Sequence, residues 1–526
     1  MTPKSLLLFL CLFSFTSAII SQLTDTRFPD REQSNRKYTN DKRLFKAYRS
    51  QLMMIYLIAN SARTAEVIVN GHKIYISFPY SWNLPMTDLR LNITQYLKDG
   101  INTFSIQNIY PLKSYIDAYV PFPTLQYGDP KSVGISPELL NKVDELITKE
   151  VKDEFPGATL VIAKNGKIIK EQAYGYARKY KDDWTLMDKY QPMHKDTMFD
   201  LGSITKIFAT LFGIMKLHSD RMLRYMNTVT QYIPEYRGIQ VHDRSKISIF
   251  DILTHSAGYN ESYHFYDDEK IFYSRDKKKT KELICSKVPL NEEKGGVPNY
   301  NDINCMLAGL LIEHITELTL DQYVKRFFYY PLGLLRTTFA PLKYGFDKED
   351  TAATEVTGNT RNKTVSFKDI REKVIQGEVQ DENAFYSMNE IAGHAGLFST
   401  AKELAILSQV ILNQGGYYDY KFWSKDTQDL FVKPYDKAIT YGIGWRRQGN
   451  EDMKAHFGAY ASSQAIGHFG STGTAVVIDP VHDLIVVLLT NKQQSSYENK
   501  KYKGDDYQTA KQGGIMQLIY ESFLNA

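Results

Sequence analysis

The sequence is short of cysteine, spreads its charge along the chain and lacks a long apolar run. The formal net charge of +4 is small for 526 residues, and no basic arm gathers the lysines, so nucleic-acid binding is disfavoured. No stretch reaches the about 20 apolar residues that a membrane-spanning helix needs. Among the three cysteines, Cys285 and Cys305 are able to pair in an oxidising compartment, although the sequence does not give their separation in space.

The first 18 residues have the pattern of a secretory signal peptide. Lys4 supplies a positive charge, an apolar stretch runs from Leu6 to Phe15, and Thr16-Ser17-Ala18 offers small residues for cleavage. The apolar stretch is too short to cross a bilayer. We therefore expect a signal peptide at residues 1–18 and a secreted protein, extracellular or periplasmic depending on the host.

A polar leader, residues 19–37, precedes a region with many strand signals. Residues 65–77 alternate apolar and polar side chains about Asn70-Gly71, the strongest short signal for a hairpin. Residues 88–94 and 102–107 follow as further short strands, and no convincing helix interrupts them. We predict a small β-sandwich module at residues 38–128, ended by a proline-rich linker. A packing or spacer role is favoured for it, with carbohydrate binding as the alternative.

The pattern changes in residues 129–526. A helix is predicted from Ser136 to about Glu154, followed by a hairpin at 158–170, and the chain closes with apolar strands at 474–480 and 484–490 and a helix at 513–524. Strands from both ends with helical signals between them indicate one antiparallel sheet flanked by terminal helices. The middle, about 200–435, is then a large helical insertion, and the fold class is α/β (α+β).

One serine stands out as a candidate nucleophile. A serine and a lysine three residues apart share a helix face, so the amine can take the proton of the hydroxyl. Four such pairs occur: Ser34/Lys37, Ser203/Lys206, Ser274/Lys277 and Ser399/Lys402. Only Ser203 begins a helix that is apolar on nearly every side, and such a helix is buried. By contrast, Thr400 and Glu403 read as a helix-capping box, which explains the fourth pair structurally.

Two further stretches carry polar groups suited to catalysis. Tyr300 and Asp302 precede a second apolar helix at 306–315, where helix N–H groups favour an anion. The glycine-rich stretch 467–474 leads into a C-terminal strand, and a strand-edge N–H is a natural donor to an oxyanion. Taken alone, the first is also explained by a packed tyrosine and the second by a glycine-rich turn.

Residues 133–526 resemble the serine β-lactamase and penicillin-binding-protein superfamily, in its class C-like branch. The resemblance rests on three motifs in the family's order: Ser-x-x-Lys, Tyr-x-Asp and His-x-Gly. Supporting stretches occur in the same order at 155–158, 174–177, 253–258, 330–334, 396–400 and 441–445. A closer similarity, to periplasmic penicillin-binding-protein-like D,D-carboxypeptidases and exo-N-acetylmuramoyl-L-alanine amidases, is indicated by the stretches 353–361, 377–387 and 393–397.

The resemblance implies a β-lactamase/transpeptidase-like fold and an acyl-enzyme mechanism. Ser203 is then the nucleophile, Lys206 and Tyr300 share the work of the general base, and the N–H groups of Ser203 and Ser471, the latter beside Gly470, form the oxyanion hole. The implied substrate is a peptidoglycan-derived amide, or another small acyl compound. No metal-ligand cluster is visible in the sequence, and the mechanism needs no cofactor.

Departures from the family pattern modify these expectations. Asp302 replaces the usual asparagine, and its negative charge is expected to keep Lys206 protonated. Tyr300 is then expected to take more of the role of general base. His468 replaces a frequent lysine, so the site has less fixed positive charge and efficient β-lactam hydrolysis is not expected. Gln380 stands where close relatives carry histidine. His255 and His394 are interpreted as loop supports.

Two other functions stay open from the sequence. The first is a carboxylesterase on the same scaffold, because a fold does not fix its substrate. The second is a non-catalytic binding relative, which the presence of Ser203, Lys206 and Tyr300 disfavours. The Gly-x-Ser-x-Gly signature of α/β-hydrolases is absent around Ser203, so that unrelated fold is disfavoured.

Overall fold

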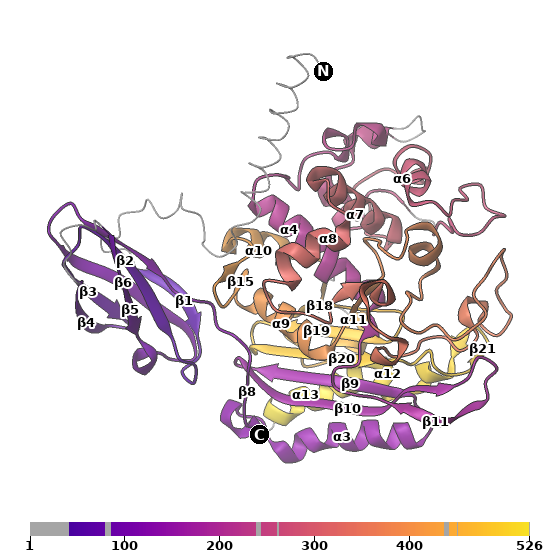
Figure 1. Cartoon of the computed structure of the whole chain (residues 1–526), viewed down its shortest axis with the longest axis horizontal. Helices are drawn as coiled ribbons and strands as arrows, with labels where there is room; N and C mark the ends of the chain where they lie inside the picture. Colours follow the sequence, from indigo (N-terminus) through magenta and orange to yellow (C-terminus); the bar gives the residue numbers. More distant parts are fainter. Residues whose placement is uncertain are drawn as a thin grey trace. The chain divides into compact units, whose positions relative to one another are not determined.

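A computed structural model of the chain describes residues 42–78, 86–237, 243–259, 262–435, 441–449 and 451–524. The predicted signal peptide and polar leader lie outside these ranges. The chain forms two compact units (Figure 1): the first ends at Thr124 and also includes Gly415–Phe422, and the second comprises Leu125–Gln414 and the chain from Trp423 onward.

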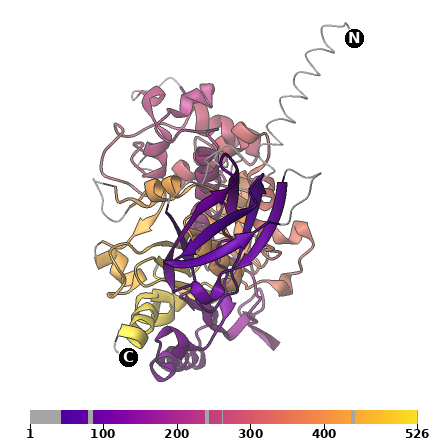
Figure 2. The same cartoon turned by 90° about the vertical axis from the view of Figure 1, so that its left-hand side faces the viewer.

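The first unit is a small antiparallel β module of two sheets, as the sequence predicts (Figure 2). Its sheets have the strand orders β1-β6-β3-β4 and β5-β2-β7. The strands are β1 (Arg43–Ala47), β2 (Met54–Asn60), β3 (Thr64–Val69), β4 (His72–Ser77), β5 (Met86–Asn92), β6 (Gly100–Tyr110) and β7 (Tyr115–Tyr119). The predicted hairpin is confirmed, since β3 and β4 pair about Asn70 and Gly71, both with positive φ. Alternate side chains of both sheets form the core.

A short hairpin from much later in the chain belongs to this module. It consists of β15 (Gly416–Tyr417) and β16 (Tyr420–Lys421). The N–H of Phe122 donates to the carbonyl of Tyr418 at 2.8 Å, and the ring of Phe122 lies where a side chain on Gly416 would be. The sequence analysis places this segment within the region 129–526, because strands of two residues carry no alternation signal.

The second unit is built on an antiparallel sheet of order β11-β10-β9-β20-β19-β18-β17, with β8 added in parallel to β10. The strands are β8 (Gln126–Tyr127), β9 (Gly157–Lys164), β10 (Lys167–Tyr180), β11 (Leu186–Pro192), β17 (Arg446–Arg447), β18 (Ile466–Phe469), β19 (Thr474–Asp479) and β20 (Leu484–Thr490). Strand β9 pairs directly with β20, which joins the two ends of the unit. The predicted sheet of N- and C-terminal strands is therefore confirmed.

Helices cover both faces of this sheet (Figure 1). On one face lie α3 (Pro137–Lys152), capped by Ser136 as predicted, and α13 (Gly513–Leu524), which share a core with β9 and β20. On the other lies α9 (Ala401–Leu412). Thr400 caps α9, but the carboxylate of Glu403 accepts from the N–H of Arg336 instead of completing a capping box.

The helical insertion lies over the α9 face of the sheet. Its helices are α4 (Phe212–Ser219), α5 (Ile249–Leu253), α6 (Lys277–Ser286), α7 (Asp302–Thr316), α8 (Leu320–Val324) and α10 (Lys425–Val432). The later helices α11 (Glu451–Phe457) and α12 (Gln508–Lys511) pack with α13 on the opposite face. A small sheet of β12 (Phe199–Asp200), β14 (Leu397–Ser399) and β13 (Thr338–Phe339) fixes the base of the insertion, and the short strands β21 (Tyr497–Glu498) and β22 (Lys501–Tyr502) pair near the end of the chain.

The described residues contain no single helix with the length and hydropathy of a membrane span. One pair, α7 with Leu320–Tyr329, passes that test together but is bent by 71°. Cys285 and Cys305 are both buried free thiols, so the disulfide considered from the sequence is not formed. Burial raises the pKa of each thiol to about 12, which keeps both protonated.

Candidate active site

Ser203 lies where β12 turns into the first buried helix of the insertion. Gly202–Ile204 form a tight 3₁₀ turn, Lys206–Leu211 a wider π-helical turn, and α4 follows. The apolar pattern after Ser203 predicts one regular helix, but the helix changes pitch twice. Lys206 nevertheless points at the serine, because its Nζ donates to Ser203 Oγ at 2.8 Å.

The ammonium group of Lys206 has an acceptor for each of its three hydrogens. Besides Ser203 Oγ, it donates to Asp302 Oδ1 at 2.8 Å and to the carbonyl of His394 at 3.0 Å. Lys206 is 4% exposed. Burial alone lowers its pKa, but the charge of Asp302 outweighs burial, so the pKa of Lys206 is raised. Lys206 is therefore a protonated partner of Asp302 in the free protein.

Tyr300 lies in the loop before α7, whose N-cap is Asn301. Lys206 Nζ is 5.1 Å from the centre of the Tyr300 ring, so the structure brings these two candidates together. Burial of the hydroxyl end raises the pKa of Tyr300, and Lys206 only partly opposes this. Tyr300 is thus a neutral phenol in the free protein, not the anion that the start of a helix would favour.

The glycine-rich stretch folds against the nucleophile turn. The hydroxyls of Thr472 and Thr474 donate to the carbonyls of Asp200 and Leu201, each at 2.8 Å. A Cβ on Gly470 would lie 2.3 Å from the carbonyl oxygen of Leu201, so only glycine fits there. A Cβ on Gly202 would lie 3.3 Å from the nitrogen of Ser471. The backbone N–H of Ser471 therefore lies beside the turn that carries Ser203.

His468 lies on β18 and is 3% exposed. Burial, together with the charge of Lys206, holds its pKa well below the ordinary value, so the imidazole is neutral. His255 is also buried, which lowers its pKa to about 3, and its Nδ1 accepts from the N–H of Asn301 at 3.2 Å. His255 thus supports the loop that carries Tyr300.

Arg446 is a charged residue of the site that sequence reasoning missed. It lies on β17 opposite Gly467 of β18. Its guanidinium carbon is 4.4 Å from the ring centre of Tyr441, 5.8 Å from that of Tyr300 and 5.6 Å from that of Phe469. Arg446 supplies the fixed positive charge that His468 does not. The sequence signal that could have identified Arg446 is its position directly after the family stretch 441–445.

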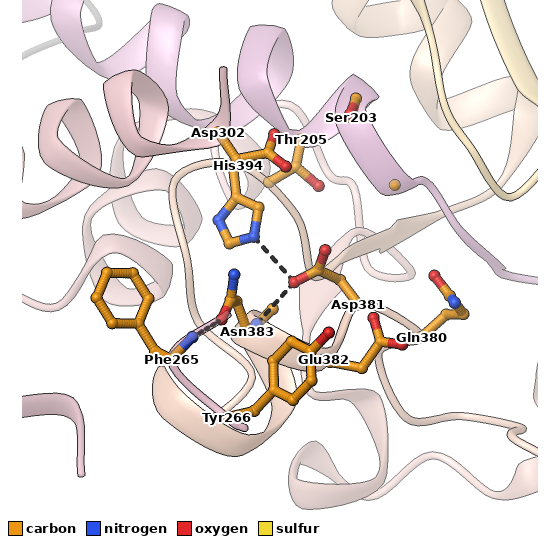
Figure 3. Close-up of polar contacts among 12 residues, drawn as sticks. Ser203, Thr205, Phe265, Tyr266, Asp302, Gln380, Asp381, Glu382, Asn383 and His394 are labelled. Atoms are coloured by element: carbon orange, nitrogen blue, oxygen red, sulfur yellow. Dashed lines mark hydrogen bonds and ion pairs between the residues drawn. The ribbon is translucent and has the colours of Figure 1, made fainter. Parts of the chain in front are cut away.

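A second polar group lies beside Asp302, the partner of Lys206 (Figure 3). His394 Nε2 and Asp381 Oδ1 are 2.9 Å apart, and the N–H of Ala384 donates to the same carboxylate at 2.8 Å. Asp302, Asp381 and His394 each place one potential metal ligand within 4.8 Å of the others. Lys206 already pairs with Asp302, so a positive charge already lies against one of the two carboxylates. Sequence reasoning found no such cluster, because its members come from three separate segments.

Asp200 connects the nucleophile turn to the loop that carries Asp381. Its Oδ1 accepts from the N–H of Gly202 at 2.9 Å, and its Oδ2 accepts from the N–H of Gln380 at 2.6 Å. Burial raises the pKa of Asp200 to about 6. The side chain of Gln380 turns away and donates to Glu355, so Gln380 takes part in the site only through its backbone.

Residues 143–509 match the Beta-lactamase family. The chain belongs to the Beta-lactamase family. It is 41% identical over 397 residues to the "N-acetylmuramyl-L-alanine amidase" of Bacillus subtilis (strain 168), covering 74% of this chain and 90% of that protein. It is 38% identical over 380 residues to the "Putative D-alanyl-D-alanine carboxypeptidase" of Escherichia coli (strain K12), covering 71% and 87%.

A comparison with solved structures gives the same fold family. A solved structure of a class C β-lactamase superposes with a TM-score of 0.53 at 16% identity, covering 75% of this chain and 99% of that chain. At this identity the similarity concerns the fold alone. The Beta-lactamase-family fold and the resemblance to carboxypeptidases and amidases, both expected from the sequence, are confirmed.

Proposed function

We propose that this Beta-lactamase-family serine hydrolase cleaves an amide bond of peptidoglycan stem peptides through an acyl-enzyme on Ser203. One observation carries the proposal: Ser203 Oγ, Lys206 Nζ and Asp302 Oδ1 form a continuous hydrogen-bonded row with two 2.8 Å contacts. Such a row can remove the hydroxyl proton in the step in which the serine attacks a carbonyl carbon.

In this hydrogen-bonded row, Lys206 and Asp302 act together as the general base. Lys206 is protonated at rest, so it can accept the proton of Ser203 only by passing one of its own to Asp302. Attack by Ser203 Oγ then forms the tetrahedral intermediate, and the proton returns through Lys206 to the leaving amine. Water repeats the cycle on the acyl-enzyme. Tyr300, as a neutral phenol beside Lys206, is placed to hydrogen-bond the leaving nitrogen.

The developing oxyanion faces the N–H groups of Ser203 and Ser471. The nucleophile turn and the glycine-rich turn are locked together by the two threonine bonds at Asp200 and Leu201. Donors held in this way need no rearrangement during the reaction, and losing one such donor typically costs about 100- to 1,000-fold in rate.

The position of Arg446 favours a substrate that carries a negative charge. A stem peptide ends in a carboxylate, and a guanidinium held among Tyr300, Tyr441 and Phe469 is suited to bind it. The names of the two relatives, "N-acetylmuramyl-L-alanine amidase" and "Putative D-alanyl-D-alanine carboxypeptidase", agree with this choice. The expected signal peptide would place the enzyme outside the cytoplasm, where such fragments arise.

Substrate ranking tests the proposal. We expect purified protein to hydrolyse muropeptides with a higher kcat/KM than short-chain nitrophenyl esters. Arg446→Gln should raise KM for the anionic muropeptide by about 10-fold, the loss of one charge-assisted contact, and leave the neutral ester nearly unchanged.

Two results would contradict the proposed substrate. Faster cleavage of esters than of muropeptides would favour the carboxylesterase alternative. Equal losses for both substrates in Arg446→Gln would remove Arg446 from carboxylate recognition. Lys142→Gln, an exposed lysine on α3, is the matched control for charge removal and should change neither KM.

A further inference from the structure

The outward face of the β5-β2-β7 sheet in the first unit carries a row of aromatic and charged side chains. Tyr56 of β2 lies opposite Arg90 of β5 and Tyr119 of β7. Two residues along β2, Ile58 lies opposite Asp117. Residues two apart on a strand share a face, so these side chains lie together, while the alternate residues pack in the core.

The hairpin β15–β16 extends the row. Its turn residues are Tyr418 and Asp419, and the hydroxyl of Tyr119 donates to the carbonyl of Tyr418 at 3.2 Å. Tyr418 is 51% exposed. The rings of Tyr56 and Tyr119 are 6.1 Å apart, and the guanidinium carbon of Arg90 lies 5.1 Å from the centre of Tyr56. The result is a half-exposed aromatic platform with a cation beside it.

The two carboxylates of the platform have no hydrogen-bond donor within the module. Among the described residues, neither the side chain of Asp117 nor that of Asp419 makes a hydrogen bond, although each residue is half-buried and one oxygen of each carboxylate is shielded from solvent. Arg90 lies over the ring of Tyr56, and its charge acts on Asp419 without a hydrogen bond. Half-buried carboxylates without donors are costly, which indicates groups arranged for a ligand and not for stability.

We infer that this platform, formed by Tyr56, Tyr119, Tyr418, Arg90, Asp117 and Asp419, binds an N-acetylated saccharide. The C–H faces of pyranose rings stack on the negative faces of aromatic rings. The carboxylates accept from hydroxyl and acetamido N–H groups, and Arg90 donates to the acetyl oxygen. Two carboxylates against one guanidinium disfavour phosphate-rich ligands, and Ile58 is the one aliphatic side chain in the row, which disfavours an apolar protein partner. This inference stands independently of the proposed hydrolase substrate.

Binding of chitotetraose to the whole mature protein, measured by calorimetry, tests the inference. We expect saturable binding that Tyr418→Ala weakens about 5- to 10-fold, the loss of one aromatic contact. Tyr56→Phe keeps the ring and should keep the affinity. Tyr75→Ala is the matched control, because Tyr75 is 78% exposed on β4 of the other sheet and should be neutral.

Three results would overturn the inference: no binding of chitotetraose by the unaltered protein, unchanged affinity in Tyr418→Ala, or an equal loss in Tyr75→Ala. The thermal unfolding of each variant, measured in parallel, reports whether the first unit is folded, so a loss of binding is not confused with unfolding. Hydrolysis of a nitrophenyl ester needs only the second unit, so failure of saccharide binding and failure of the hydrolase proposal are distinguished.

Discussion

At the scale of single residues, the least expected feature is Asp302. A carboxylate in place of an amide pairs with Lys206 at 2.8 Å and, despite the opposing effect of burial, its own pKa is lowered by Lys206 and His394. A lysine held as an ammonium would be a poor base alone. In the proposed mechanism Asp302 is its proton acceptor, so Lys206 acts as a relay and Ser203 keeps a route for its proton.

Asp302→Asn should change the pH dependence of acylation. In the unaltered protein the proton moves inside the Lys206–Asp302 pair, so the rate is flat between the lowered pKa of Asp302 and the raised pKa of Lys206. In the variant, Lys206 loses the charge of Asp302 but stays buried, so its pKa falls. Lys206 must then lose its proton to water, and the rate should rise about 10-fold per pH unit up to that lowered pKa and level off above it. Stopped-flow acylation by a nitrophenyl ester, from about pH 5 to 9, measures this.

Asp426→Asn is the control for this variant, since Asp426 also lies in the first turn of a helix, α10, but is exposed. It should reproduce the unaltered profile. A profile in Asp302→Asn that matches the unaltered protein in both rate and shape would show that Asp302 does not accept the proton.

At the scale of elements, the segment 393–397 holds the site together. Its carbonyls accept from Thr210 and Lys206, and the N–H of Leu397 donates to the hydroxyl of Thr205 at 3.1 Å. The segment approaches α7 closely, since a Cβ on Gly393 would lie 2.1 Å from the carbonyl oxygen of Cys305. One short loop therefore positions Lys206 against both Ser203 and Asp302.

Gly393→Ala should displace this loop. Because the clash is with backbone, we expect the free energy of unfolding to fall by about 1–3 kcal/mol. Loss of the contact between Lys206 and the carbonyl of His394 should lower ester hydrolysis on the order of 100-fold, as for other small misplacements of catalytic groups. Thermal unfolding and steady-state kinetics measure the two effects.

Gly296→Ala is the matched control, because a Cβ there has no atom within 4 Å. It should leave stability and activity unchanged. Full activity in Gly393→Ala would mean that the loop does not set the position of Lys206.

The same elements show which residues of the site can be predicted from the sequence. Ser203 and Lys206 are neighbours on one segment, so spacing and an apolar continuation were enough to select them. Arg446, Asp381 and the carbonyl of His394 come from separate segments, and only tertiary packing brings them to Lys206. The change from a 3₁₀ to a π-helical turn at Ser203 is equally hidden, since periodicity does not distinguish these pitches in a short apolar stretch.

At the scale of the whole molecule, the sheet of the second unit was predictable because its strands are long and apolar. Strand β9 is buried along all eight residues, and β20 along all seven. The hairpin at residues 416–421 was not predictable, because its strands have two residues each and its partners lie about 300 residues earlier in the chain, as for Tyr119 and Tyr418. Each unit thus has its own core, and the chain crosses between them more than once.

The central claim is that Ser203 is the acylated nucleophile, and covalent labelling tests it most directly. A fluorescent penicillin or a phosphonate probe should add one probe mass to the protein, and peptide mapping should place it on Ser203. Ser203→Ala should abolish labelling, while Ser463→Ala, at an exposed serine, should retain it. Labelling of Ser203→Ala at the unaltered level would contradict the account.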